Sequence, residues 1–176
     1  GKVYARGSIS LAAAQAAGSR FEKARLLLQR KVLDTYSDMA LLAERLRIQK
    51  EHVDLLAIEV GQGAARLKTG KAVQEDLLQA GIDFDLARNR LKAMEAQALP
   101  LAARMNALLG RPAQAHVPLP ETLPESHPPP LPDDRLLALA AQMSPELAAL
   151  AHESAGSEAA VDLARQAGVP DLKLFA

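Results

Sequence analysis

The side chains of this sequence that could do chemistry are few, and their spacing suits no common reaction. Four of them are histidines: His52, His116, His127 and His152. No two of these lie at the short spacing that places a pair of zinc ligands on one element. We therefore expect no metal site.

Nucleophilic and acid–base catalysis lack their usual contexts as well. Ser126 precedes His127 and Ser144 precedes His152, but neither serine lies in a nucleophile elbow, and no glycine-rich phosphate loop is present. Glu75 and Asp76 could be imagined as an acid–base pair. Adjacent residues on a helix point about 100° apart, however, and the tip of a hairpin offers no enclosed pocket. The sequence predicts neither an enzyme nor a bound cofactor.

Composition favours long helices over a thick globular core. The chain has 176 residues, of which 49% are hydrophobic, yet it contains three Phe, two Tyr and no Trp. Alanine and leucine supply most of the apolar residues, as is typical of helices packed closely along their length.

Charge and hydropathy exclude further classes. Lys and Arg together number 21, as do Asp and Glu, so the chain has no net basic field for binding nucleic acid. No apolar run approaches the roughly 18 residues that would span a bilayer as a helix. Cysteine is missing, which rules out disulfide and thiolate chemistry and permits an oxidising compartment.

Two heptad-spaced runs lie in mirror order around Gly70. The first run is Val32, Tyr36, Met39, Ala43, Leu46, Lys50, Val53, Ala57, Val60, Ala64 and Leu67. The second is Val73, Leu77, Ala80, Phe84, Ala87, Leu91, Met94, Ala98, Leu101, Met105 and Leu108. Both alternate steps of four and three, which is the period of helices in a left-handed supercoil. The sequence predicts an all-α fold: a long antiparallel coiled-coil helical hairpin plus two shorter helices.

The hairpin is expected over residues 1–110, with helices at about 11–68 and 73–109 and a tip at 69–73. Gly70 and Gly110 suit the left-handed position that ends a helix, and Pro100 should kink the second helix or remove one hydrogen bond. Lys50 is interpreted as a snorkelling or register-setting residue of the seam. A second apolar line on the longer helix predicts contact with a second neighbour; it comprises Leu41, Ile48 and Leu55. Because the second helix is shorter, we expect the later helices to cover the rest of the first.

The remainder divides into a connector and two helices. Residues 111–132 hold eight of the eleven prolines and should lie extended. Residues 133–168 are expected to form two shorter helices, the first capped by Asp133 or Asp134 and the second opened by Ser144 and Pro145. Residues 169–176 look like the start of a strand. Both ends suggest a segment of a larger protein.

Several motifs, in this order, resemble the TolC-like outer-membrane efflux protein family, in its heavy-metal (CzcC-type) branch. They are GKVYAR with LAAAQAAGSRFEKAR, VLDTYSDMALLAERLRIQKE, GKAVQEDLLQA, ALLGRP, and SPELAALAHESAGSEAAVDLARQAGVPDLKL. Val3 stands where the family usually has Arg, and Ser144 where the second repeat usually opens with Asn.

The resemblance implies a function and a location for the segment. It would be the periplasmic part of a trimeric outer-membrane efflux channel that exports small solutes, including heavy-metal cations, in a tripartite pump. Its partners would be a periplasmic adaptor protein and, through it, an inner-membrane pump. Membrane contact would occur only through strands that this segment lacks. A free-standing structural or adaptor coiled-coil hairpin that binds another helical protein is the alternative.

The resemblance also assigns roles to tip residues. The adaptor would contact Lys68, Thr69, Gly70, Lys71 and Ala72. Asp76 maps to a carboxylate that lines the aperture of the channel, and Gln79 occupies the position of a second such carboxylate.

Overall fold

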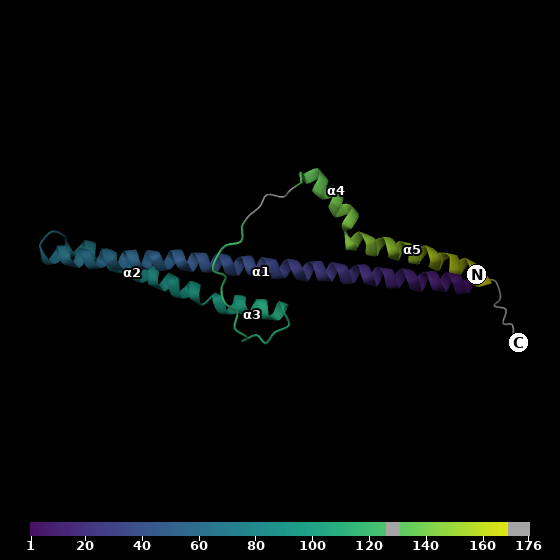
Figure 1. Ribbon diagram of the computed structural model, residues 1–176, viewed down its shortest axis with the longest axis horizontal. Coiled ribbons are helices and arrows are strands. Elements are labelled where there is room, and N and C mark those ends of the chain that lie inside the picture. The colour runs from purple at the N-terminus through teal and green to yellow at the C-terminus, as the bar shows by residue number, and fades with distance from the viewer. Residues whose placement is uncertain (126–130, 169–176) are drawn as a thin grey trace. The chain divides into compact units, whose positions relative to one another are not determined.

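The computed structural model describes residues 1–125 and 131–168, and the regular structure of these residues is entirely helical. The helices are α1 (Lys2–Lys68), α2 (Gln74–Glu95), α3 (Ala98–Leu108), α4 (Asp133–Met143) and α5 (Pro145–Arg165), with a 3₁₀ turn at Gln166–Gly168 (Figure 1). This confirms the expected all-α fold. The predicted strand at 169–176 lies outside the described residues.

The chain divides into two compact units that share α1. The hairpin unit is Arg30–Ser126, and the terminal unit is Gly1–Gln29 with His127–Ala176. The division falls within α1, whereas the sequence placed it after residue 110. The reason is that different helices pack against the two parts of α1, so each unit has its own set of contacts.

In the hairpin unit α2 and α3 run back along α1 (Figure 1). The side-chain amide of Gln49 donates to the backbone carbonyl of Ala87 at 3.0 Å. Gly63 of α1 faces Leu77 of α2, and each lies seven residues from Gly70. The two helices are therefore antiparallel, and the Gly63–Leu77 contact lies in the mirror register that the apolar pattern predicts.

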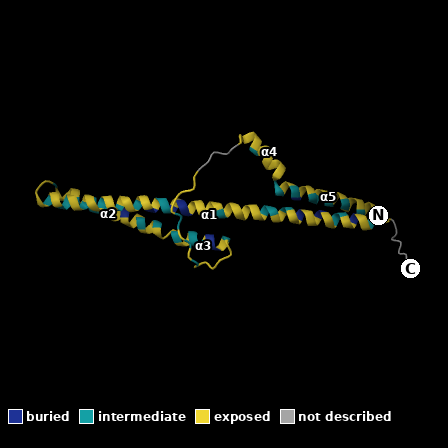
Figure 2. Ribbon diagram, viewed as in Figure 1, coloured by how far each residue is buried: buried dark blue, intermediate teal, exposed yellow. Residues whose placement is uncertain are grey.

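The burial pattern of α2 and α3 follows the predicted seam. From Leu77 to Leu108 every seam position is buried or half-buried (Figure 2). The seam position before Leu77 is Val73, and it is 61% exposed. Val73 precedes the first turn of α2 as its N-cap residue, so it lies in the tip and not between the helices.

The seam of α1 was predicted half correctly. Met39, Leu46, Val53, Val60 and Leu67 are buried or half-buried as expected. Along the other line of the seam the structure buries or half-buries the residue before each predicted one, namely Thr35, Leu42, Gln49, Leu56 and Gly63. Of the predicted residues, Tyr36, Lys50 and Ala57 are exposed, whereas Ala43 and Ala64 are half-buried as well.

The shift has a physical cause. Burying Leu42 and Leu56 removes more apolar surface from water than burying Ala43 and Ala57 would. It also leaves Lys50 exposed, where its charge stays hydrated. The interpretation of Lys50 as a seam residue is therefore wrong, and Gln49 takes its place.

Pro100 interrupts the second arm of the hairpin, as predicted, but the break lies upstream of it. Helix α2 ends at Glu95 and α3 begins at Ala98, which puts Pro100 in the first turn of α3. The amide of Gln97 bonds to the carbonyl of Met94 at 3.0 Å, a tightened 3₁₀ contact. Proline is tolerated in a first turn because the N–H that it lacks would have no intrahelical acceptor there.

In the terminal unit α5 lies along the first part of α1 (Figure 1). Two ion pairs join them, Arg20 with Glu153 and Lys23 with Glu146. Between the helices a Cβ on Gly156 would lie 3.2 Å from that of Ala12, so small residues allow a close approach. Of the later helices, α5 thus covers the first part of α1, whereas residues 24–31 are exposed, so the expected cover is only partial.

Two boundaries in this unit differ from the prediction. Helix α1 begins at Lys2 and not near residue 11, because Ala5 in its first turns is already buried. Helix α4 has Pro132 as its N-cap with no capping side chain, so Asp133 and Asp134 lie within its first turn instead of capping it. Ser144 does cap α5, accepting from the amide of Leu147 at 3.3 Å, with Pro145 following it.

Candidate functional site

The tip of the hairpin is a tight turn fixed by the backbone. Gly70 has φ +69°, the left-handed conformation that glycine adopts without steric cost. The amide of Lys71 bonds to the carbonyl of Arg66 at 2.8 Å, and that of Gly70 to the carbonyl of Leu67 at 3.0 Å. These two bonds form a Schellman motif, which satisfies carbonyls at the end of α1.

One side chain of the tip reinforces the turn, and the charged side chains of the tip are exposed to solvent. The hydroxyl of Thr69 donates to the carbonyl of Arg66 at 3.0 Å. Residues 68–71 are all exposed and Ala72 is half-buried. The backbone is thus held in one conformation while Lys68 and Lys71 are presented to solvent, as a contact surface requires.

A groove of about 470 Å³ begins beside the tip, and we refer to it as the tip groove. Its apolar part includes Leu55 and Ile58 of α1, with Ala72 and Ala80 from the other side. Its charged residues are Glu59, Arg66 and Asp76.

The structure separates the two residues expected to line an aperture. Asp76 lies in the tip groove. Gln79 is exposed, and its amide donates to the carboxylate of Asp83 at 3.1 Å, one turn further along α2. Asp76 and Gln79 therefore have different surroundings although three residues separate them.

A stripe of nine exposed residues runs along the outside of α1. We call it the outer stripe: Asp38, Leu41, Arg45, Ile48, His52, Leu55, Glu59, Gln62 and Arg66. The three residues of the predicted second apolar line lie in it, and Leu41, Ile48 and Leu55 are 41%, 53% and 62% exposed. The stripe borders the tip groove at one end and a second groove of about 440 Å³ near Pro100 at the other.

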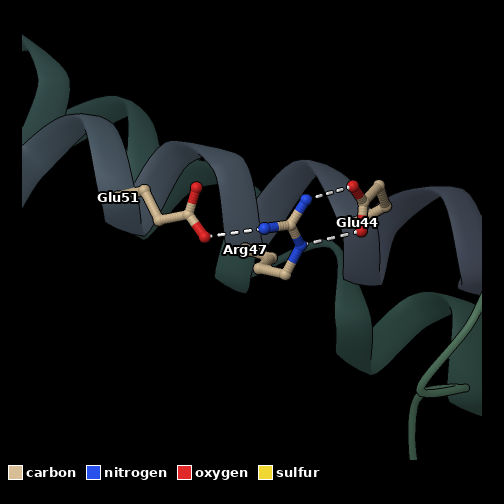
Figure 3. Close-up of polar contacts among 3 residues, drawn as sticks. All are labelled: Glu44, Arg47 and Glu51. Carbon is tan, nitrogen blue, oxygen red and sulfur yellow. Dashed lines mark hydrogen bonds and ion pairs between the residues drawn. The ribbon is translucent and has the colours of Figure 1, made fainter.

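Near the outer stripe α1 carries a ladder of charges, Glu44, Arg47 and Glu51 (Figure 3). Arg47 donates to Glu44 through Nε at 3.0 Å and Nη2 at 2.6 Å, and to Glu51 through Nη1 at 2.6 Å. The hydrogen bond from Arg47 lowers the pKa of Glu44, and the same contact raises the pKa of Arg47. The guanidinium of Arg47 is thus paired with two carboxylates of its own helix.

Asn106 is a structurally important residue that sequence reasoning missed. It is completely buried, and its Nδ2 donates to the carbonyls of Ala113 at 3.2 Å and Ala115 at 2.7 Å. It therefore ties the start of the connector to α3. The one available signal was a polar residue beside the predicted seam position Met105.

Two features are missing from the part of the chain that the structure describes. No helix within residues 1–125 and 131–168 has the length and apolarity needed to cross a membrane. Among these same residues no three His, Asp or Glu side chains are placed to hold a metal ion.

The described residues thus form a helical hairpin with an exposed turn at its end and an exposed stripe on its longer helix. The family model described as "Outer membrane efflux protein" matches residues 1–111. The chain belongs to this family. No curated protein and no solved structure gives a significant match.

Family membership bears on the expected class of protein and on its expected partners. The family is one of outer-membrane efflux channels and is non-enzymatic, which confirms the expectation that the chain is not an enzyme. Its members generally work as trimers with adaptor proteins and inner-membrane pumps.

Proposed function

We propose that this chain is the periplasmic part of a trimeric outer-membrane efflux channel within a tripartite pump. The family match over residues 1–111 is the observation that carries the proposal. That region contains the whole hairpin from α1 to α3. The transported solutes are small, and the resemblance to the heavy-metal branch extends the proposal to metal cations.

In this proposal the tip is the contact with the periplasmic adaptor. The support is geometric: Lys68, Thr69, Gly70 and Lys71 are exposed on a turn whose backbone is fixed by the Schellman motif. A rigid, exposed turn loses little conformational entropy when a partner binds.

Asp76 is proposed to line the aperture of the assembled channel. It lies in the tip groove with Arg66 and Glu59, close to the end of the hairpin. The tie between Gln79 and Asp83 supports a lesser role for Gln79.

The exposed outer stripe favours the channel over a free-standing hairpin. Three half-exposed large apolar residues recur at heptad spacing along it. Such a line of apolar residues indicates a further helix as neighbour, as in a wall of hairpins. A free-standing two-helix hairpin has no need of it.

Site-specific cross-linking tests the docking mode. The chain has no cysteine, so Lys71→Cys and Ala72→Cys each introduce a single reactive thiol at the tip. In cells that carry the protein with its adaptor and pump, both variants should cross-link to the adaptor. Lys50→Cys, on the exposed flank of α1, is the matched control and should not. Cross-links at residue 50 without any at the tip would contradict tip docking.

A further inference from the structure

The two grooves of the hairpin unit share one layout on α1. In the second groove, which we call the Pro100 groove, four α1 residues lie at positions i, i+3, i+4 and i+7: Asp38, Leu41, Leu42 and Arg45. The tip groove repeats this spacing with Glu59, Gln62, Gly63 and Arg66. Four such residues on a packed helix form a hole, which receives one side chain, the knob, of a facing helix. Each groove therefore contains a hole suited to a side chain of another helix.

The two holes are in phase along α1. Glu59 follows Asp38 by 21 residues, which is three heptads and roughly 31 Å of helix. Helices in a left-handed supercoil turn the same face toward each other at every heptad. One partner helix can therefore place a knob in each hole, with the same three heptads between the two knobs.

The hole in the Pro100 groove carries an excess of positive charge. Two guanidinium groups line this groove, from Arg45 of α1 and Arg104 of α3, beside the carboxylate of Asp38. Asp38 lies 3.8 Å from Arg104, whereas Arg45 forms no ion pair within the part of the chain that the structure describes. A helix that covers the groove removes water from these charges, and an arginine deprived of water needs a carboxylate partner.

Another arginine of α1 shows the opposite arrangement. Arg47 does not line the Pro100 groove, and its guanidinium lies 2.6 Å from carboxylate oxygens of both Glu44 and Glu51. Helix α1 thus neutralises the arginine outside the groove with its own carboxylates. It leaves Arg45, at the corner of the hole, available to a partner.

We propose that the hole in the Pro100 groove receives an Asp or Glu side chain from a helix of a neighbouring hairpin in the channel wall, where its carboxylate pairs with Arg45 and Arg104. This inference rests on the channel function proposed above, which supplies the neighbouring hairpin. A second side chain of the same helix, three heptads away, fills the hole in the tip groove. Pairs of arginine and carboxylate have a defined geometry, so the acidic knob fixes the register between the two hairpins, as a single polar residue does in a coiled coil.

Photo-cross-linking from the rim of the hole identifies the partner while both arginines stay in place. A photoreactive benzoylphenylalanine replaces Leu41 in the whole channel protein, in cells that also carry the adaptor and the pump. Irradiation should attach residue 41 to another segment of the channel protein. Mass spectrometry should then find an Asp or Glu within one helical turn of the attachment point. The same photoreactive residue in place of Lys50, on the exposed flank of α1, should not attach to that segment.

Charge reversal tests what the acidic knob does. Arg45→Glu should lower the yield of trimer that survives mild detergent about tenfold, because it sets two carboxylates against each other in a covered site. Replacing the carboxylate found by cross-linking with Arg, in the same chain as Arg45→Glu, should restore the yield. Lys50→Glu, the same type of change on α1 outside the groove, should leave the yield unchanged.

Several outcomes would overturn the acidic knob. They are attachment of residue 41 to the adaptor or to a segment without a nearby carboxylate, a normal trimer yield with Arg45→Glu, and a second reversal that fails to restore it. The cross-link from Lys71→Cys to the adaptor separates this failure from that of the channel. If the tip still cross-links to the adaptor, the channel proposal stands without the acidic knob. If the tip does not cross-link and no trimer forms in the wild type, the channel proposal itself fails.

Discussion

The side chain of Gln49 reaches across the hairpin and donates a hydrogen bond of 3.0 Å to the carbonyl of Ala87. It is a polar residue in the middle of the α1 seam, at a position where heptad helices usually carry an apolar one. The contact links the two arms at one point, with Gln49 of α1 beside Ala87 of α2.

Replacing Gln49 should weaken the hairpin. Gln49→Ala removes the hydrogen bond and part of the packing between the arms, so we expect a loss of about 1–2 kcal/mol in the free energy of unfolding. Urea denaturation followed by helical circular dichroism measures it. Lys50→Ala, one residue along on the exposed flank, should change the value by less than about 0.5 kcal/mol. Equal effects of the two substitutions would contradict the seam described above.

Gln49 also shows what the sequence could and could not predict. The sequence was enough to predict the turn at Gly70, the break near Pro100 and the α2 seam. Glycine and proline have well-defined effects on a helix, and the large apolar residues of α2 form a single line at heptad spacing. In α1 two lines one residue apart both satisfy the four–three spacing. Choosing between them requires the packing of Leu42 and Leu56 against the other arm, which is a tertiary property. The tip roles of Lys71 and Asp76 stay predictions, because they depend on partners outside the chain.

Asn106 should prove essential for the connector. Asn106→Ala removes the donor that bonds the carbonyls of Ala113 and Ala115 and leaves both without this partner, at an expected cost of about 1–3 kcal/mol. Asn106→Asp should cost more at neutral pH, because a buried carboxylate would face two carbonyl oxygens. Urea unfolding compares the variants, and hydrogen exchange at Ala115 reports the connector. An Asp variant as stable as the Ala variant at pH 7 would refute this account.

Acid should weaken the contribution that the ladder of charges on α1 makes to the stability of the chain. The hydrogen bond from Arg47 lowers the pKa of Glu44 below its ordinary value. The folded chain therefore holds the Glu44 proton less tightly than the unfolded chain does. The resulting stabilisation is present above the unfolded pKa and is lost as the pH falls through the folded pKa.

The matched variant for this effect is Arg47→Gln, which keeps helix propensity while removing the charge. The free energy of unfolding, measured from pH 7 down to pH 2, should fall less steeply for this variant than for wild type below about pH 5. Two-dimensional NMR titration of the Glu44 side chain should show its pKa rising toward the ordinary value in the variant. Superimposable pH profiles and an unchanged Glu44 titration would exclude the ladder as a source of acid sensitivity.

Replacement by alanine should have opposite effects on the free energy of unfolding at two glycines of the hairpin. Gly70 has φ +69°, and neither it nor Gly81 has an atom within 4 Å of an added Cβ. Crowding is therefore equal at both sites, and only backbone conformation differs. Gly70→Ala should destabilise the chain by about 1–2 kcal/mol, because an L-residue is strained in the left-handed region. Gly81→Ala, inside α2, should stabilise it by about 0.5–1 kcal/mol.

Thermal unfolding of the two variants beside wild type measures this difference, and the cross-linking assay gives it functional meaning. If the fixed turn is what presents Lys71 to the adaptor, Gly70→Ala should lower the Lys71→Cys cross-linking yield while Gly81→Ala leaves it unchanged. A Gly70→Ala chain that is destabilised yet cross-links as efficiently as the parent would show that the adaptor recognises tip side chains without needing the Schellman turn. Stabilisation by Gly70→Ala would instead mean that the tip does not hold the left-handed conformation.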